Sequence, residues 1–323
     1  MESLSRYQIL FDNYLENNKQ KSKPHGLYAP IQYILSLGGK RLRPLLALMA
    51  TEAFGNKPED ALPAALSVEV FHNFTLIHDD IMDQAPLRRG APTVHNKWDE
   101  NTGILSGDAM LIQAYQCLES YPNELFVKLI NHTSKTALEV CEGQQYDMDF
   151  ETQKDVTISA YLEMIRLKTA VLVGHSLKIG AWMGNASDQE AQLLYDFGVL
   201  LGLAFQIQDD YLDAFGDPKD FGKQVGGDIL ENKKTILYHE VMKIGNTKEK
   251  EALFHWYDTI EKNNQKVIAV KNIFKSSGAS IASQKLVTSY TEDAFKKLES
   301  LIISAQGKEL LIEFGQNLMN RKF

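Results

Sequence analysis

The stretch LIHDDIMD, residues 76–83, and its counterpart IQDDYLD, residues 207–213, each end an apolar run with helical periodicity. Both contain the pattern Asp-Asp-x-x-Asp, in which the first and third aspartates lie on one face of a helix. The clusters consist of Asp79, Asp80 and Asp83, and of Asp209, Asp210 and Asp213. Carboxylates this close together repel one another unless a cation lies among them, which predicts metal binding at both clusters.

The ligand type and the flanking residues indicate the substrate. Oxygen ligands without His or Cys favour Mg²⁺, which binds through a few carboxylates and completes its coordination with substrate phosphates. Apolar residues lie further back on the same helix faces, Val68 and Phe71 before the first cluster, and Gly202 and Leu203 before the second. A pocket that is apolar at depth and metal-lined at its mouth suits a phosphorylated lipid.

The composition limits the partners. Of the 323 residues, 44% are hydrophobic and 24% charged, as in an ordinary globular protein, and the net charge of −8 argues against nucleic acid. No apolar stretch approaches the ~18 residues of a transmembrane helix, and the first residues lack signal-peptide features. Cys117 and Cys141 are expected to be free thiols. We therefore predict a cytoplasmic protein without a transmembrane segment.

Helical periodicity dominates the chain, and strand-like alternation is nearly absent. Helices are predicted over residues 4–20, 28–37, 41–54, 59–83, 101–120, 123–150, 155–182, 187–213, 232–243, 248–262, 265–282 and 284–304. Two polar stretches, 84–96 and 216–234, follow the aspartate clusters and have the composition of loops that close over a ligand. We expect a single all-α domain over residues 1–323, a large helical bundle.

Basic residues gather near the clusters. Lys40, Arg41 and Arg43 lie at a predicted helix start, where they oppose the helix dipole and are expected to hold an anion. Others follow the clusters: Arg88 and Arg89 after the first, Lys223 and Lys233 after the second. Arginine offers forked donors to phosphate and lysine a mobile point charge, so these residues also indicate a phosphorylated substrate.

Motifs occur in a fixed order from about Gly38 to Thr235: GGKRLRP, LIHDDIMD with RRG after it, the pair Lys168-Thr169, and FQIQDDYLD with GK after it. In this order they resemble the trans-isoprenyl diphosphate synthases, or polyprenyl synthetases. The resemblance implies the isoprenoid synthase fold, helices around a deep central cavity, usually as a homodimer. It implies an enzyme that joins an allylic diphosphate (dimethylallyl, geranyl or farnesyl) head to tail with isopentenyl diphosphate, using three Mg²⁺.

The resemblance also implies roles for individual residues. Asp79 and Asp83 would bind two Mg²⁺ and Asp209 the third, with Asp80, Asp210 and Asp213 in support. The allylic diphosphate would be held by Arg88, Lys168 and Lys223, and isopentenyl diphosphate by Lys40, Arg43, His72 and Arg89. Lys233 matches the family lysine after the loop. Thr169 and Gln206 would place oxygens near the developing allylic cation, and Gln144 and Asp147 would lie close to the metal ligands.

The chemistry fits these roles. Breaking an allylic C–O bond creates a carbocation and diphosphate, whose charge the metals and cations neutralise. The carbocation needs a dry cavity, and the released diphosphate can take the final proton, so no side-chain base is required. His78 is an alternative base, but a packed or capping role is expected for it.

The depth of the cavity below the first cluster is expected to set product length. The resemblance implies that Phe74, five residues before Asp79, forms a floor, and Phe71 lies about 12 Å along the axis from Asp79. On a helical wheel, however, Thr75 lies nearer the Asp79 face. Phe71, Phe74 and Thr75 are thus the candidates for product length. We predict a C20 product, with C15 as the alternative and no chains beyond C25.

Other functions remain open at this stage. A terpene cyclase also ionises an allylic diphosphate, but it needs neither the GGKRLRP motif nor a second Asp-Asp-x-x-Asp. A non-catalytic partner subunit would be expected to lose its aspartate motifs. A helical cation-binding scaffold would leave the ordered Lys and Arg residues unexplained. The preferred allylic primer, the downstream pathway and the role of the C-terminal third cannot be predicted.

Overall fold

The computed structural model describes residues 2–18, 22–153, 155–216, 226–259 and 262–320, and it confirms the all-α fold. The first half contains α1 (Glu2–Asn17), α2 (His25–Ser36), α3 (Leu42–Ala53), η1 (Pro58–Ala61), α4 (Leu62–Met82), α5 (Val94–Lys97), α6 (Glu100–Gln116) and α7 (Asn123–Thr152). The second half contains α8 (Ile158–Ile165), a π-helical segment η2 (Arg166–Ala170), α9 (Val171–Met183), α10 (Asp188–Phe215), α12 (Gly227–Leu230), α13 (Ile236–Ile244), α14 (Thr247–Asp258), α15 (Asn264–Ser276), α16 (Ala279–Glu299) and α17 (Ala305–Met319). In the described residues, no helix is long and apolar enough to cross a membrane.

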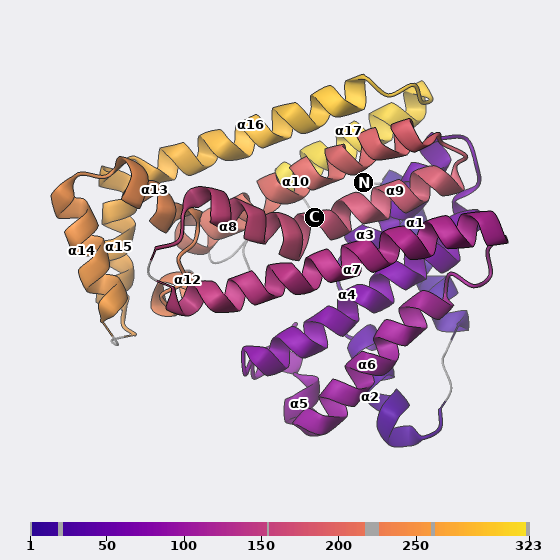
Figure 1. Ribbon diagram of the computed structural model, residues 1–323, viewed down its shortest axis with the longest axis horizontal. Coiled ribbons are helices and arrows are strands. Elements are labelled where there is room, and N and C mark those ends of the chain that lie inside the picture. Colours follow the sequence, from indigo (N-terminus) through magenta and orange to yellow (C-terminus); the bar gives the residue numbers. More distant parts are fainter. Residues whose placement is uncertain (1, 19–21, 154, 217–225, 260–261, 321–323) are drawn as a thin grey trace.

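The buried apolar residues form two clusters. The larger lies around α3, α4, α9 and the first part of α10, and the smaller lies among the end of α10, α8 and α13 to α15. Helix α10 runs between α9 and α16 and contributes to both clusters (Figure 1). Its start is fixed by a capping box, in which Ser187 and Glu190 satisfy each other's backbone N–H groups.

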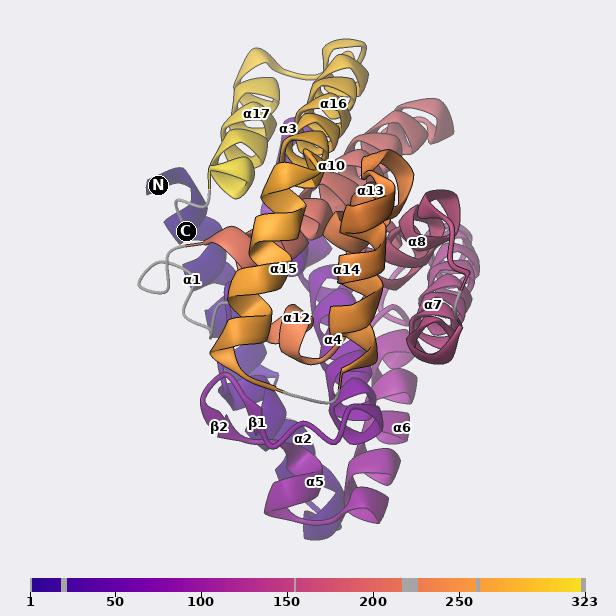
Figure 2. The ribbon, with the colours of Figure 1, turned by 90° about the vertical axis from the view of Figure 1, so that its left-hand side faces the viewer.

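Both aspartate helices, α4 and α10, end at the same side of the molecule. This is the left-hand side of Figure 1, where α12 to α15 also lie. Figure 2 looks onto this side, with α14 and α15 in front, α12 between them, and a short hairpin of β1 (Leu87–Arg88) and β2 (Ala91–Pro92) below.

Several helix boundaries differ from the prediction. The predicted helix 265–282 spans two helices. Helix α15 ends at Ser276, and α16 begins at Ala279, directly after Gly278, whose φ of +82 is not helical. The predicted start at residue 232 is wrong, since α13 begins at Ile236. Helix α17 was missed, although Leu311, Phe314 and Leu318 have helical spacing and are buried. The hairpin within 84–96 was also missed.

Candidate active site

The first aspartate cluster is held by Arg88 on β1. The Arg88 Nε donates to both carboxylate oxygens of Asp80 at 3.0 Å, and its Nη2 donates to Asp80 Oδ1 at 2.6 Å. The Asp80 side chain is only 1% exposed, and Arg88 Nη2 also lies 3.9 Å from Asp79 Oδ2. The middle aspartate is therefore engaged by the protein, whereas Asp83 is exposed at the end of the helix.

Lys168 lies on the π-helical segment and connects two carboxylates. Its Nζ donates to Asp147 Oδ2 at 2.5 Å and lies 3.4 Å from Asp79 Oδ1. The backbones of α7 and the π-helical segment pack closely here: a Cβ on Gly143 of α7 would lie 2.2 Å from the backbone nitrogen of Lys168. Asp79 Oδ1 is buried and accepts no hydrogen bond. An unsatisfied carboxylate oxygen in this position fits a cation ligand.

The second cluster is held differently. Asp210 Oδ2 accepts hydrogen bonds from the Tyr161 hydroxyl on α8 and from the Ile236 N–H at 3.2 Å, which begins α13. Gln206 Nε2 donates to Asp210 Oδ1 at 3.3 Å. Burial, together with the nearby Asp228 carboxylate, raises the pKa of Asp210 to about 7. Asp210 thus links its own helix, α10, to α8 and α13.

Asp228 on α12 is an acidic residue of this site that was not predicted. Its N–H donates to Asp213 Oδ2 at 3.1 Å, and burial and Asp213 raise the pKa of Asp228 to about 6. Lys233 lies 3.3 Å from Glu231. Burial opposes the charge on Lys233, but Asp228 and Glu231 outweigh it and raise the pKa of Lys233. The aspartate within GGDIL, in the loop after the second cluster, was the available sequence signal.

A chain of contacts links the two clusters. Asp79 contacts Lys168; the next residue, Thr169, donates from Oγ1 to Gln206 Oε1 at 3.3 Å; and Gln206 in turn donates to Asp210. Partial desolvation of the Asp83 carboxyl group and the nearby Asp79 raise the pKa of Asp83, and the charges of Lys168 and Lys233 partly oppose this rise. The ends of α4 and α10 therefore face a shared polar region.

A second group of cations surrounds His72. Arg43 Nη1 lies 3.1 Å from His72 Nε2, and Arg43 Nε is buried without a hydrogen bond. Burial and the neighbouring Arg89 lower the pKa of Arg43 to about 10, and burial and Arg43 lower the pKa of His72 far below its usual value. Arg89, at φ +53, donates to the Gly38 carbonyl. A buried guanidinium nitrogen without a hydrogen bond, next to a second arginine, fits an anionic ligand.

The other predicted residues have different settings. The expectation that Arg41 holds an anion is wrong, because its buried guanidinium bonds Glu69 and the Leu35 carbonyl. Lys40 is exposed beside it. Gln144 Nε2 lies 3.7 Å from Met82 Sδ rather than against an aspartate. Lys223 lies outside the described residues, as does much of the second predicted loop.

The ligand set fits Mg²⁺ only with help from a substrate. In the part of the chain that the structure describes, no three His, Cys, Asp or Glu side chains are placed to hold a metal by themselves. The donors present are carboxylate oxygens, one of them unsatisfied on Asp79. Since Mg²⁺ commonly takes one or two carboxylates and completes its shell with phosphate oxygens, this geometry suits a metal–diphosphate complex.

A narrow hollow lies behind the first cluster. It is a gap in the packing that is too narrow for a water-sized sphere. Its lining comes from α4, α7 and α9: Ser67, Val68, Phe71, Thr133, Thr136, Ala137, Leu172 and His175. The rings of Phe71 and Phe74 are 5.5 Å apart, and Phe74 packs on His78 at 4.8 Å. His78 Nε2 meets the Ile104 carbonyl at 3.1 Å, which fits the packed role expected for it.

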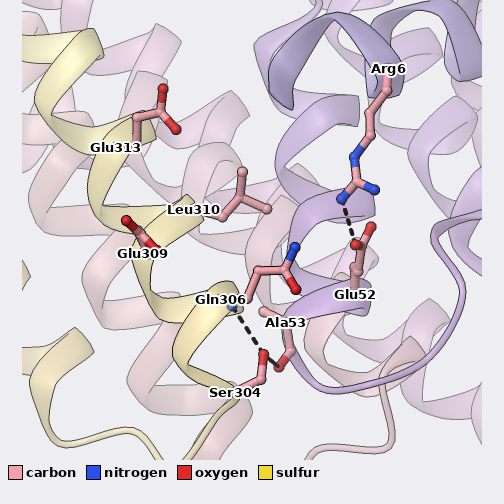
Figure 3. Close-up of a pocket in the computed structure, with 9 residues that line it drawn as sticks. Arg6, Glu52, Ala53, Ser304, Gln306, Glu309, Leu310 and Glu313 are labelled. Atoms are coloured by element: carbon pink, nitrogen blue, oxygen red, sulfur yellow. Dashed lines mark hydrogen bonds and ion pairs between the residues drawn. The ribbon is translucent and has the colours of Figure 1, made fainter. Parts of the chain in front are cut away.

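A separate pocket of about 310 Å³ lies between α1, α3 and α17 (Figure 3). Arg6 is paired with Glu52, and the remaining charged residues of the lining are Glu309 and Glu313. None of the predicted site residues borders this pocket. The acidic lining does not suit an anionic substrate.

Comparison with known proteins places the chain in a family. The polyprenyl synthetase family matches residues 24–276. A geranylgeranyl diphosphate synthase of Methanosarcina mazei is 39% identical over 304 residues, 94% of this chain and 92% of that protein. A short chain isoprenyl diphosphate synthase of Methanothermobacter thermautotrophicus is 36% identical, covering 100% of this chain and 98% of that protein. A crystal structure of geranylgeranyl pyrophosphate synthase is 51% identical, with a TM-score of 0.96 and full coverage of both chains.

The fold and these matches define the class of protein as a trans-prenyltransferase of the short-chain type. The chain belongs to the polyprenyl synthetase family. Enzymes of this family act on isoprenyl diphosphates with the help of divalent metal.

Proposed function

We propose that the chain condenses an allylic diphosphate with isopentenyl diphosphate and releases mainly the C20 product, geranylgeranyl diphosphate. The observation that carries the proposal is the shared polar region between the two aspartate helices, linked through Lys168, Thr169 and Gln206. The names of the relatives favour the same product length.

In this proposal, Asp79, Asp83 and Asp209 hold Mg²⁺. The ions would neutralise the leaving diphosphate when bound. Asp80 and Asp210 keep the clusters in place through their bonds to Arg88 and to Tyr161 with Ile236, and Asp213 does so through the N–H of Asp228. The count of three ions comes from the family resemblance.

The two diphosphates are assigned to different cations. Arg88, Lys168 and Lys233 border the aspartates and would bind the allylic diphosphate, together with Lys223. Arg43, His72 and Arg89, with Lys40 nearby, would bind isopentenyl diphosphate, whose charge would satisfy the buried Arg43 Nε. Separate binding places the allylic carbon beside the nucleophilic double bond.

We assign Thr169 and Gln206 to face the developing carbocation. Their oxygens lie between the two clusters, 3.3 Å from each other. Fixed dipoles aimed at developing charge lower the barrier without reorganisation. The final proton goes to the released diphosphate, so no side chain needs to act as base.

Product length is assigned to Phe71 and Phe74. Phe71 lines the hollow and Phe74 packs on Phe71, so the two rings stand between the polar region and the hollow. The lining also contains polar groups, since Thr136 Oγ1 and His175 Nδ1 are buried without hydrogen bonds. The hollow is too narrow even for a water-sized sphere, so the lining side chains would have to move before a longer chain could enter, which disfavours longer products. Thr75 bonds the His72 carbonyl.

We further propose that residues 1–323 form one domain and that the protein is a homodimer. Helix α10 contributes to both buried clusters, which supports a single folding unit. Large apolar residues are exposed on two helices that follow each other in the chain: Leu105 and Ile112 on α6, and Val127 and Leu138 on α7. Exposed large apolar residues favour an interface with a second copy.

The test is to incubate the purified protein with Mg²⁺, labelled isopentenyl diphosphate, and dimethylallyl, geranyl or farnesyl diphosphate in turn. Chromatography of the dephosphorylated products should give mainly C20 alcohol. A product that stops at C15 would replace the C20 assignment. Cyclic hydrocarbons made without isopentenyl diphosphate, or no product at all, would contradict the proposal.

A further inference from the structure

Lys266 on α15 is a buried cation far along the chain from every motif of the site. Its residue is 0% exposed. Its Nζ donates to Asn232 Oδ1 and to the Thr259 carbonyl at 3.3 Å. A buried ammonium is costly unless its protons are bonded, so a lysine whose partners are neutral oxygens calls for a specific purpose.

Asn232 occupies a tight turn directly before Lys233. Its φ is +59, in the left-handed region that asparagine tolerates better than most residues other than glycine. The turn is closed by the Asn232 N–H bonding the Ile229 carbonyl at 3.2 Å and by the Lys233 N–H bonding the Asp228 carbonyl at 2.9 Å. The bond from Lys266 holds the asparagine side chain and therefore helps to hold this backbone conformation.

A second contact reaches the same turn from the neighbouring helix. The Tyr257 hydroxyl on α14 donates to the Lys233 carbonyl at 3.3 Å, and the Lys266 Nζ lies 6.0 Å from the centre of the Tyr257 ring. Figure 2 shows α14 and α15 side by side with α12 between them, at the side where both aspartate helices end. The two helices thus grip consecutive residues, Asn232 and Lys233.

We infer that Lys266 and Tyr257 are positioning residues that set the direction of the Lys233 side chain toward the two aspartate clusters. The inference rests on the proposed role of Lys233 in binding the allylic diphosphate. It gives the helices after Thr235 a part in the reaction: α14 and α15 hold the turn at Asn232, and this turn sets the orientation of the Lys233 side chain. A misplacement of about 1 Å at such a contact can cost on the order of a hundredfold in rate.

Lys266→Met is the main variant, because it keeps most of the length of the unbranched side chain and removes the charge and the bonds. The KM for the allylic diphosphate should rise about tenfold, while the KM for isopentenyl diphosphate, held by Arg43 and His72, should stay within about twofold. Lys262→Met is the matched control: it removes an exposed lysine just before the same helix and should change neither constant. Circular dichroism would check that each variant is folded.

Two milder variants keep the test decisive if Lys266→Met fails to fold. Tyr257→Phe removes only the hydroxyl, and Asn232→Gly keeps the left-handed backbone but removes the acceptor for Lys266. Each should raise the allylic KM severalfold. In folded protein, adding Lys266→Met to Asn232→Gly should have little further effect, because both changes break the same bond.

Lys233→Met separates the inference from the function on which it rests. If it raises the allylic KM while the Lys266, Asn232 and Tyr257 variants do not, the positioning role is overturned and the proposed function stands. Equal rises in both KM values in those three variants would indicate a general structural effect and would also overturn it. If Lys233→Met itself has no effect, both the inference and the assigned role of Lys233 fail.

Discussion

The two aspartate clusters have the same spacing, but the protein holds their middle members in different ways. Asp80 is gripped by a guanidinium, through the forked contacts of Arg88. Asp210 is held by neutral donors, the Tyr161 hydroxyl and the Ile236 N–H. A repeated motif in sequence therefore does not imply a repeated environment.

The difference extends to the surrounding charge. Arg88 and Lys168 lie beside the first cluster and compensate its carboxylates. Around the second, burial and Asp228 raise the pKa of Asp210 to about 7, and burial and Asp213 raise that of Asp228 to about 6. The second cluster is thus more dependent on added cations, whereas the first is largely arranged before any ligand arrives.

Removing one metal-binding carboxylate from each cluster should have the largest effect. Asp79→Asn should lower kcat about a thousandfold, and Asp209→Asn about a hundredfold, because Asp79 is assigned to two ions and Asp209 to one. Steady-state rates at saturating substrates and Mg²⁺ would measure both. If the kcat of Asp79→Asn lay within tenfold of the wild-type value, the first cluster would not be part of the metal site.

Removing the contacts that hold the middle aspartates, Asp80 and Asp210, should have the next largest effect on kcat. Arg88→Met leaves Asp80 buried without its charged partner and should lower kcat about a hundredfold. Tyr161→Phe leaves Asp210 with the Ile236 N–H and Gln206, and should cost about tenfold. The same rates provide the readout, and equal losses would mean that the two grips are equivalent.

The apolar regions behind the clusters should also respond differently. Phe71→Ala opens the hollow and should shift the product from C20 toward C25, as measured by chromatography. Gly202→Ala on α10 should destabilise the protein by about 1–3 kcal/mol and leave product length unchanged, because its Cβ would lie 2.7 Å from Ala170 and meets packing instead of a hollow. A longer product from Gly202→Ala would contradict this distinction.

The smallest effect concerns pH. Burial lowers the pKa of His175 to about 3, so the folded state binds fewer protons than the unfolded state, whose histidine titrates near about 6.5. The stabilisation that neutral His175 contributes is fully present above the unfolded pKa and is lost as pH falls toward the folded pKa. Between pH 7 and 5, this one residue should cost about 2 kcal/mol in free energy of unfolding.

Denaturant unfolding of His175→Leu should show a correspondingly flatter pH dependence. His132, whose pKa burial lowers to about 2, packs on His175 at 4.9 Å and should add to the effect in a double variant. A variant with the wild-type slope would mean that the pKa of His175 in the folded protein is not lowered.

The sequence predicted the helical architecture, since apolar periodicity is a local signal. The family resemblance implied that Thr169 and Gln206 serve the same part of the site, and their side chains lie 3.3 Å apart. It placed Arg88 near the first cluster but did not predict the hairpin, which depends on Arg89 adopting φ +53. That strain is not visible in residue order. Arg41 was misread because its buried partner, Glu69, is remote in sequence.

The contact from Lys266 to Asn232 joins residues 34 positions apart and leaves no periodic pattern. Asp228 was overlooked because its only sequence signal is its position after the second cluster, and a single acidic residue has no spacing that indicates a role. Helix α17 could have been predicted, since the helical spacing of Leu311, Phe314 and Leu318 is present in the sequence.

The most direct measurement is a crystal structure with Mn²⁺ and a non-reactive thio analogue of an allylic diphosphate, with metals located by anomalous scattering. The predicted result is one diphosphate between α4 and α10, bridged by metal ions that contact Asp79 and Asp83 on one side and Asp209 on the other. Ions bound at only one helix, or a diphosphate bound elsewhere, would contradict the account.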